Sequence, residues 1–157
     1  MKKKIEGFNQ AAKGTPFLVL TDLDQNQCAP SLMQDWLSSP RHPNLIFRVA
    51  IREVEAWVMA HRSAFAHFLG LPCSRIPNAP DTIPDAKRCL IELAKTSKKT
   101  SIRKDIVPQL SSKTGPNYNG QLSAFIYQSW SSKEARKNSP SLDKAILALE
   151  KFKPRYC

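Results

Sequence analysis

The chain of 157 residues lacks several features that would assign it to a common class of protein. No apolar run approaches the roughly 20 residues that a helix needs to cross a bilayer. The N-terminal segment "MKKKIEGFNQAAKG" has lysines but no apolar core behind them, so it is not a secretory signal. Glycine-rich nucleotide-binding loops, internal repeats and low-complexity segments are also absent from the sequence. We therefore expect a cytoplasmic protein without a standard nucleotide-binding motif.

The sequence also has no cysteine motif of the kind that binds zinc. Its four cysteines are scattered and include no C-x-x-C pair; they are Cys28, Cys73, Cys89 and Cys157. We expect reduced thiols, which are typical of cytoplasmic proteins. Cys28 has no histidine near it in the sequence, so a packed thiol is favoured over a nucleophile.

Positive charge is what the chain has in excess. It has 24 Lys and Arg residues against 13 Asp and Glu, which gives a formal net charge of +11. A polyanionic partner, most simply nucleic acid, accounts for such an excess, although many basic proteins have no such partner. Clustering favours nucleic acid, and the densest group of basic residues consists of Lys95, Lys98, Lys99, Arg103 and Lys104.

Hydrophobic periodicity predicts alternating helices and strands in the first third of the chain. A helix is expected at 2–13, a strand at 16–21, a helix at 30–37 and a strand at 44–51. This order with short links predicts the α/β class, with a partial Rossmann-like parallel sheet flanked by helices. In such sheets ligands bind at the carboxyl ends of the strands.

The remainder is expected to be mainly helical and to belong to one domain of residues 1–157. Residues 1–70 form the α/β portion, which ends in a helix from residue 53 with a break near 62–63. Residues 71–157 form a loop-rich and helical portion, with helices expected at 85–95, 121–130 and 141–152. The basic stretch 96–120 is the expected mobile loop, because Gly115, Pro116 and Gly120 interrupt regular structure.

Acidic side chains follow both predicted strands. The run "PFLVLTDLD" leads a buried strand into Asp22 and Asp24, which the pleat turns to the same side. Glu53 and Glu55 follow the second strand, whose carboxyl end lies beside that of the first in a parallel sheet. Such oxygen ligands suit Mg²⁺ or Mn²⁺, which orients and activates water for phosphodiester cleavage. A solvated turn for the aspartates and a helix start or ion pairs for the glutamates are the alternatives.

Over residues 16–62 these motifs resemble one group of proteins. "VLTDLD" with a nearby cysteine, followed by "FRVAIREVEAWVMAHR", is similar to uncharacterised bacterial proteins with a Toprim-like domain, often found beside ATPases in phage-defence loci. The later segments "DAKRCLIELAK", "GPNYNGQL" and "SPSLDKAI" are similar to the same group. The resemblance to the wider Toprim class, which includes the OLD-type nucleases, is distant.

The resemblance implies a Toprim fold with Mg²⁺ at the acidic cluster and an ATPase as a partner. Asp22 and Asp24 match the D-x-D ligands, Glu53 or Glu55 matches the later acidic motif of OLD-type nucleases, and Lys87 matches a late basic residue. Toprim domains also have an earlier glutamate at the end of a preceding strand. Because only 21 residues precede Asp22, we expect the N-terminal part of the domain to be missing from this chain.

Two functional hypotheses follow. In the first, a Mg²⁺-dependent nuclease or nuclease-like component cleaves DNA or RNA, with metal on Asp22, Asp24 and Glu55 and phosphate on Lys87 and the basic stretch 95–104. In the second, a non-catalytic basic protein binds nucleic acid or docks on a partner protein, and its metal site is incomplete. Neither hypothesis involves a membrane.

Overall fold

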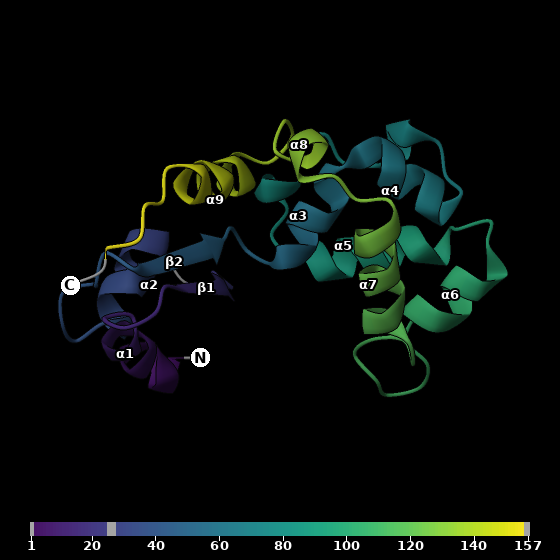
Figure 1. Ribbon diagram of the computed structural model, residues 1–157. Helices are drawn as coiled ribbons and strands as arrows, with labels where there is room; N and C mark the ends of the chain where they lie inside the picture. The colour runs from purple at the N-terminus through teal and green to yellow at the C-terminus, as the bar shows by residue number, and fades with distance from the viewer. Residues whose placement is uncertain (1, 25–27, 156–157) are drawn as a thin grey trace.

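The N-terminal part of the protein is a small α/β unit in the computed structural model, which describes residues 2–24 and 28–155. Helix and strand alternate as α1 (Lys2–Ala11), β1 (Phe17–Asp22), α2 (Ala29–Trp36) and β2 (Leu45–Ala50). β1 and β2 pair in parallel, with Phe17 opposite Leu45 and Asp22 opposite Ala50. The predicted α/β class is confirmed, because helices flank a parallel sheet that has two strands among the described residues (Figure 1).

Each face of this sheet is covered by different helices. One face packs on α1 and α2 in an apolar cluster whose buried members include Ile5, Val19, Leu32, Phe47 and Val49. The opposite face is covered by α9 (Pro140–Glu150), whose Leu142 and Ala145 pack with Ala50 of β2. In Figure 1, α9 accordingly lies above the sheet and α1 lies below it. The period of two along a strand explains this division, since alternate side chains point to opposite faces.

Beyond β2 the chain forms a helical part around a second core. Its elements are α3 (Val54–Ala60), α4 (Arg62–Leu69), the short 3-10 turns η1 (Cys73–Arg75) and η2 (Pro80–Thr82), α5 (Ala86–Lys95), α6 (Thr100–Ile106), α7 (Tyr118–Gln128) and α8 (Ser132–Ala135). Met59, Phe65, Leu69, Leu90 and Ile106 are fully buried in this core. The predicted break near residues 62–63 is confirmed, because α3 ends at Ala60 and α4 begins at Arg62.

The sequence analysis does not predict which elements of the two portions pack together. The helical part begins soon after β2, and most buried side chains of α3 and α4 lie in the helical core. Trp57 and Ala60 of α3 also pack with Ala50 of β2. The last helix, α9, returns to the sheet and contacts β2. The sheet is therefore covered by helices from both ends of the sequence. Contacts between residues far apart in the sequence decide which helices cover the sheet, and the periodicity of apolar residues does not predict such contacts.

The prediction of a loop at 96–120 is wrong for residues 100–106 and 118–120, which are helical, whereas residues 107–117 form no helix or strand. Residues 100–106 form α6, whose Ile102 and Ile106 lie four positions apart and are both buried. The following segment is held against the end of α6, because the Gly115 N–H donates to the Ile106 carbonyl at 3.0 Å. A Cβ on Gly115 would lie 2.2 Å from the Asp105 carbonyl oxygen, so glycine permits this close approach. Gly120 likewise lies inside α7, which begins at Tyr118 rather than near residue 121.

Two helices have N-cap residues whose side chains accept a backbone N–H of the first turn. Asp85 accepts the Arg88 N–H at 2.7 Å ahead of α5, and Ser139 accepts the Leu142 N–H at 3.2 Å ahead of α9. Both helices begin close to the predicted positions. Within residues 2–24 and 28–155, no helix is long and apolar enough to cross a membrane.

The cysteines differ in part from the expectation. Cys28, Cys73 and Cys89 are free, as expected, and Cys157 lies outside the described residues. Cys28, however, is exposed, so the prediction of a packed thiol is wrong for this residue. Its Sγ lies 3.1 Å from the Ser31 Oγ at the start of α2, where the chain is at the surface.

Candidate functional site

The carboxyl ends of β1 and β2 continue into two residues with unusual backbone conformations. Asp24 has a φ of 49° and Arg52 a φ of 64°, in the left-handed region that non-glycine residues rarely adopt. The two residues are neighbours, because the Asp24 N–H donates to the Arg52 carbonyl at 2.9 Å and the Arg52 Nη1 donates to the Asp24 carbonyl at 3.3 Å. Such conformations cost on the order of 1–3 kcal/mol each and are concentrated at functional sites.

Asp22 is the last residue of β1, and it faces the start of α3. Its Oδ1 accepts the Val54 N–H at 2.8 Å. Partial burial raises the pKa of the Asp22 carboxyl, and the negative charges of Glu55 and Asp24 raise it further. The fold therefore holds this carboxylate where its negative charge is disfavoured.

Glu53 joins the end of β2 to the first turn of α5. Its Oε2 accepts the Lys87 N–H at 2.7 Å, and the side chain remains partly exposed. Burial raises the pKa of the Glu53 carboxyl, and the charges of Glu55 and Asp85 act in the same direction. Glu53 is thus a second carboxylate near the strand ends whose ionised form is disfavoured.

Glu55 differs from the other carboxylates because it is buried, with 5% of its surface exposed. Its Oε1 accepts a hydrogen bond from the Tyr118 hydroxyl at 3.0 Å and pairs with the Lys87 Nζ at 3.4 Å. Its Oε2 is buried and has no hydrogen-bond partner among the described residues. A buried carboxylate oxygen without a donor is costly, so this orphaned oxygen marks a place where a positive group is favoured.

Lys87 is the cation that lies near the carboxylates of Glu55 and Glu53. Burial of the ammonium lowers the pKa of Lys87, but the charges of Glu55 and Glu53 raise it more, and the net pKa is raised. The Tyr118 hydroxyl also has a raised pKa, because it is buried beside Glu55. Lys87 therefore stays protonated, and its side chain is 41% exposed, so it is accessible from solvent.

Two hollows on the surface meet at Glu53. One, of about 540 Å³, is lined by Asp24, Arg52, Glu53, Pro84 and Asp85. The other, of about 480 Å³, extends past Lys87 and Arg88 to Lys95, and it shares Glu53 and Asp85 with the first. A polyanion that follows these hollows would pass the carboxylates and then the row of basic side chains on α5.

The structure thus brings together the predicted site residues Asp22, Asp24, Glu53, Glu55 and Lys87, which lie close enough to influence one another's charge. Their oxygen donors are of the type that Mg²⁺ prefers. In the described part of the chain, however, no three or more His, Cys, Asp or Glu side chains are grouped so that they could hold a metal ion. The donor types fit Mg²⁺, whereas the arrangement of the side chains is not a closed set of ligands.

The predicted basic stretch is only partly available for an anion. Lys95 lines the second hollow and pairs with Glu92 at 2.7 Å. Lys99 donates to the His67 carbonyl at 2.9 Å, and Arg103 donates to the Ser97 carbonyl, so both hold neighbouring segments together. Lys98 and Lys104 are exposed, and neither lines a hollow that contains the carboxylates.

Three residues of the site carry no signal in the sequence that would have identified them. Tyr118 lies 63 positions from Glu55, and Asp85 and Arg88 line the hollows through their places at the start of α5. Asp85 does resemble a helix cap in the sequence, but a cap does not show which hollow it faces. Comparison of the chain with models of protein families, with curated proteins and with solved structures found no match.

Proposed function

We propose that this protein is a Mg²⁺-dependent phosphodiesterase that acts on nucleic acid, with a Toprim-like arrangement of its acidic residues. The observation that carries the proposal is the convergence of carboxylates and one lysine at the carboxyl ends of β1 and β2. This is the edge of a parallel sheet at which ligands bind. The strained backbone of Asp24 and Arg52 at the same edge supports a functional role.

The carboxylates differ in exposure. Asp24 and Glu53 face a surface hollow, Asp22 is half-buried, and Glu55 is buried. Because no three of the described carboxylates are grouped around one ion, Mg²⁺ would be held by Asp24 and Glu53 together with water and phosphate oxygens of the substrate. Glu55 is held instead by Lys87 and Tyr118. Bound Mg²⁺ would neutralise phosphate charge and lower the pKa of an attacking water.

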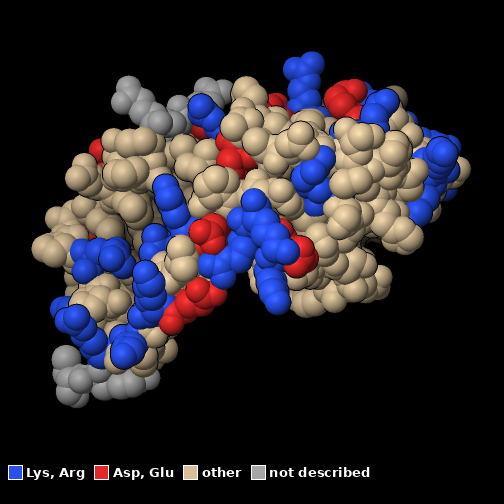
Figure 2. Space-filling model, turned by 90° about the horizontal axis from the view of Figure 1, so that it is seen from above, with Lys and Arg blue, Asp and Glu red and all other residues tan. Residues whose placement is uncertain are grey.

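The residues of the chain itself would position the substrate. Lys87 is oriented by its ion pair with Glu55, so its partly exposed ammonium can donate to a phosphate oxygen beside the carboxylates. Arg88 and Lys95 continue the basic lining of the second hollow along α5. Basic side chains also outnumber acidic ones over the α/β end of the face shown in Figure 2, on the left, which favours approach of a polyanion.

Cleavage of labelled single-stranded DNA, double-stranded DNA and RNA with Mg²⁺ or Mn²⁺ tests the proposal directly. We expect cleavage that EDTA abolishes and that Asp24→Asn and Glu53→Gln each reduce by about 100-fold or more. Asp35→Asn is the matched control, because Asp35 is an exposed aspartate on α2 and should leave the rate unchanged.

A second function, binding of nucleic acid without catalysis, is favoured by one observation. No closed group of metal ligands is present among the described side chains. Titration calorimetry with Mg²⁺ and Mn²⁺ separates the two functions, since a phosphodiesterase requires metal binding that Asp24→Asn weakens. Retention of nucleic acid with no cleavage and no metal binding would contradict the phosphodiesterase and leave the binding protein. The ATPase partner and the role in phage defence remain predictions of the family resemblance.

A further inference from the structure

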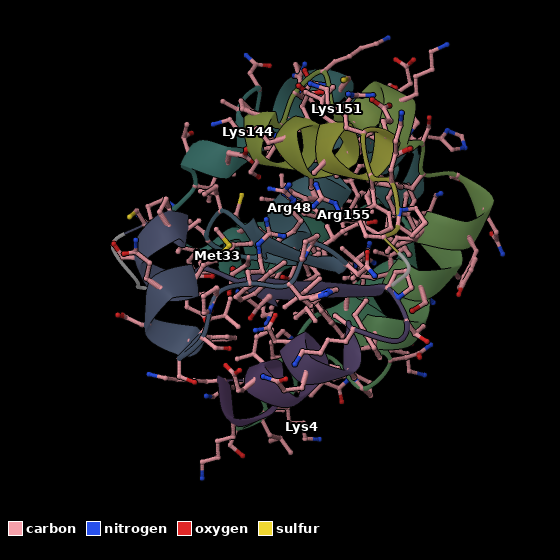
Figure 3. All side chains as sticks on the ribbon, turned by 60° about the vertical axis from the view of Figure 1, so that its left-hand side comes forward. Lys4, Met33, Arg48, Lys144, Lys151 and Arg155 are labelled. Carbon is pink, nitrogen blue, oxygen red and sulfur yellow. The ribbon has the colours of Figure 1, made fainter. Side chains whose placement is uncertain are left out.

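A further cavity of about 640 Å³ adjoins the first acidic hollow at Arg52, which lines both. It is lined by residues of α2, β2, η2 and α9 and by residues that follow the two strands, among them Leu23 and Ile51. None of its lining residues belongs to β1 itself. The cavity therefore follows the edge of β2 that faces away from β1. Figure 3 shows Arg48 and Met33 between α2 and α9 in this region, with Lys144 on α9 above them.

The charged groups around this cavity are mainly positive. Arg48, Arg52 and Lys144 line it, and Asp81 is its one acidic side chain among the described residues. Asp81 is already engaged, because its Oδ1 accepts the Ser139 hydroxyl at 2.7 Å and its Oδ2 accepts the Ser141 N–H at 2.8 Å. The positive charge of the cavity is therefore not neutralised from within its lining.

Arg48 is the most informative of these cations. It extends from the middle of β2, and its Nε is buried with no hydrogen-bond partner among the residues that the structure describes. Burial of a guanidinium N–H without an acceptor is costly, so the position favours a ligand that supplies an acceptor oxygen. The planar fork of arginine suits phosphate oxygens in particular.

The rest of the cavity is apolar and large enough for an organic molecule. Met33 of α2, Phe47 and Val49 of β2, and Ala145 of α9 contribute to its wall. A volume of about 640 Å³ and an apolar lining with a few convergent polar groups are typical of sites for small ligands. An ion alone would leave most of this wall without contact.

We propose that the cavity binds a small phosphate monoester whose remaining part is apolar or aromatic. The phosphate would lie among Arg48, Arg52 and Lys144, and the body of the ligand would lie against Met33 and Phe47. A dianionic phosphate matches the two positive charges that remain when Asp81 is set against the three cations. Nucleoside monophosphates and alkyl phosphates both combine a phosphate with an apolar or aromatic part. Binding of such a ligand would be a function in addition to the proposed phosphodiesterase activity.

Titration calorimetry of the full chain with AMP, octyl phosphate and inorganic phosphate tests this site. We expect AMP or octyl phosphate to bind more tightly than inorganic phosphate, and Lys144→Gln to weaken that binding by about 10-fold. Lys151→Gln is the matched control, because it removes the same charge at the exposed end of α9, outside the cavity, and should not change affinity. Tighter binding of AMP would identify an aromatic base, and tighter binding of octyl phosphate an alkyl chain.

Arg48→Met provides the second variant, and its melting temperature shows whether it folds. It should lose binding of the organic phosphate, whereas Asp24→Asn with Glu53→Gln should keep it, which separates this site from the acidic hollows. The proposal is overturned if neither organic phosphate binds at concentrations up to about 10 mM. It is also overturned if both organic phosphates bind no more tightly than inorganic phosphate. Equal affinity of Lys144→Gln and the wild-type chain would overturn it as well, since Lys144 is exposed and its loss leaves the fold intact.

Discussion

Asp22 shows how a single residue at the strand ends differs from an ordinary surface carboxylate. Its Oδ1 accepts the Val54 N–H, which favours the ionised form, but burial and the charges of Glu55 and Asp24 oppose it more strongly. The pKa of Asp22 in the folded chain is therefore raised. Because the unfolded chain has no such penalty, the ionised Asp22 lowers the stability of the fold at neutral pH. Residues kept at the expense of stability are typical of functional sites.

Asp22→Asn is expected to stabilise the protein at pH 7 by roughly 2 °C in melting temperature, measured with EDTA present. The amide oxygen can still accept the Val54 N–H, while the charge is removed. A raised folded pKa means that the penalty is full above that pKa and is lost as the pH falls below it. The difference between variant and wild type should therefore vanish toward pH 4. An equal gain for the exposed control Asp35→Asn, or a gain that persists at low pH, would contradict this assignment.

At the scale of elements, the site depends on how α3, α5 and α7 meet. α3 begins soon after β2 and carries Glu55 in its first turn. α5 presents the Lys87 side chain to Glu55, and the Lys87 backbone N–H donates to Glu53. α7 begins at Tyr118, whose buried hydroxyl donates to Glu55. Three helices from distant parts of the sequence thus share one carboxylate.

Tyr118→Phe tests this connection, because it removes only the hydroxyl that joins α7 to α3. Glu55 would lose a donor while it remains buried, so we expect the free energy of unfolding to fall by about 1–3 kcal/mol in urea titrations. Tyr127→Phe on the same helix removes a hydroxyl that is at the surface, where the residue is 90% exposed, and should have no measurable effect. Equal stability of the two variants would mean that the hydrogen bond to Glu55 does not tie α7 to α3.

At the scale of the whole molecule, the return of α9 to the sheet joins the two parts. α9 packs on β2, and Trp57 of α3 donates to the Ser141 hydroxyl at 2.6 Å. The C-terminal segment is also fastened, because Asn44 exchanges two hydrogen bonds of 2.7 Å with the backbone of Arg155. Basic residues from β2, α9 and this segment consequently lie on one end of the molecule (Figures 2 and 3).

Binding of nucleic acid should therefore depend strongly on salt. Each phosphate that a Lys or Arg neutralises releases counterions, so the logarithm of the binding constant should fall linearly with the logarithm of the salt concentration. We expect Lys151→Gln to reduce this slope by roughly one, measured by fluorescence anisotropy with a labelled oligonucleotide. Asp35→Asn, an exposed change on α2 that lies outside both acidic hollows, is the control for a general effect of altered charge and should not reduce the slope. Binding that is insensitive to salt would contradict an electrostatic interface.

Much of the local structure was predictable from sequence, because it depends on neighbouring residues. The apolar runs predicted as strands at 16–21 and 44–51 contain β1 (Phe17–Asp22) and β2 (Leu45–Ala50) almost entirely. The parallel pairing of these strands brings Asp22 and Asp24 near Glu53 and Glu55. Helix α6 was not predicted, because its sequence is mostly polar and charged and contains only two buried apolar residues, Ile102 and Ile106. The spacing of apolar residues predicts helices and strands only where a segment contains enough apolar residues to show a period.

Contacts between distant residues were decided only by the tertiary structure. The sequence by itself determined the α/β order, the strand ends with their carboxylates and the excess of positive charge. The fold alone decided that Glu55 is buried with Tyr118 and Lys87, that α9 covers the sheet, and that Arg48 faces a cavity beside α2. The physical reason is that burial and pairing depend on which surfaces exclude water together, and residues many positions apart create those surfaces.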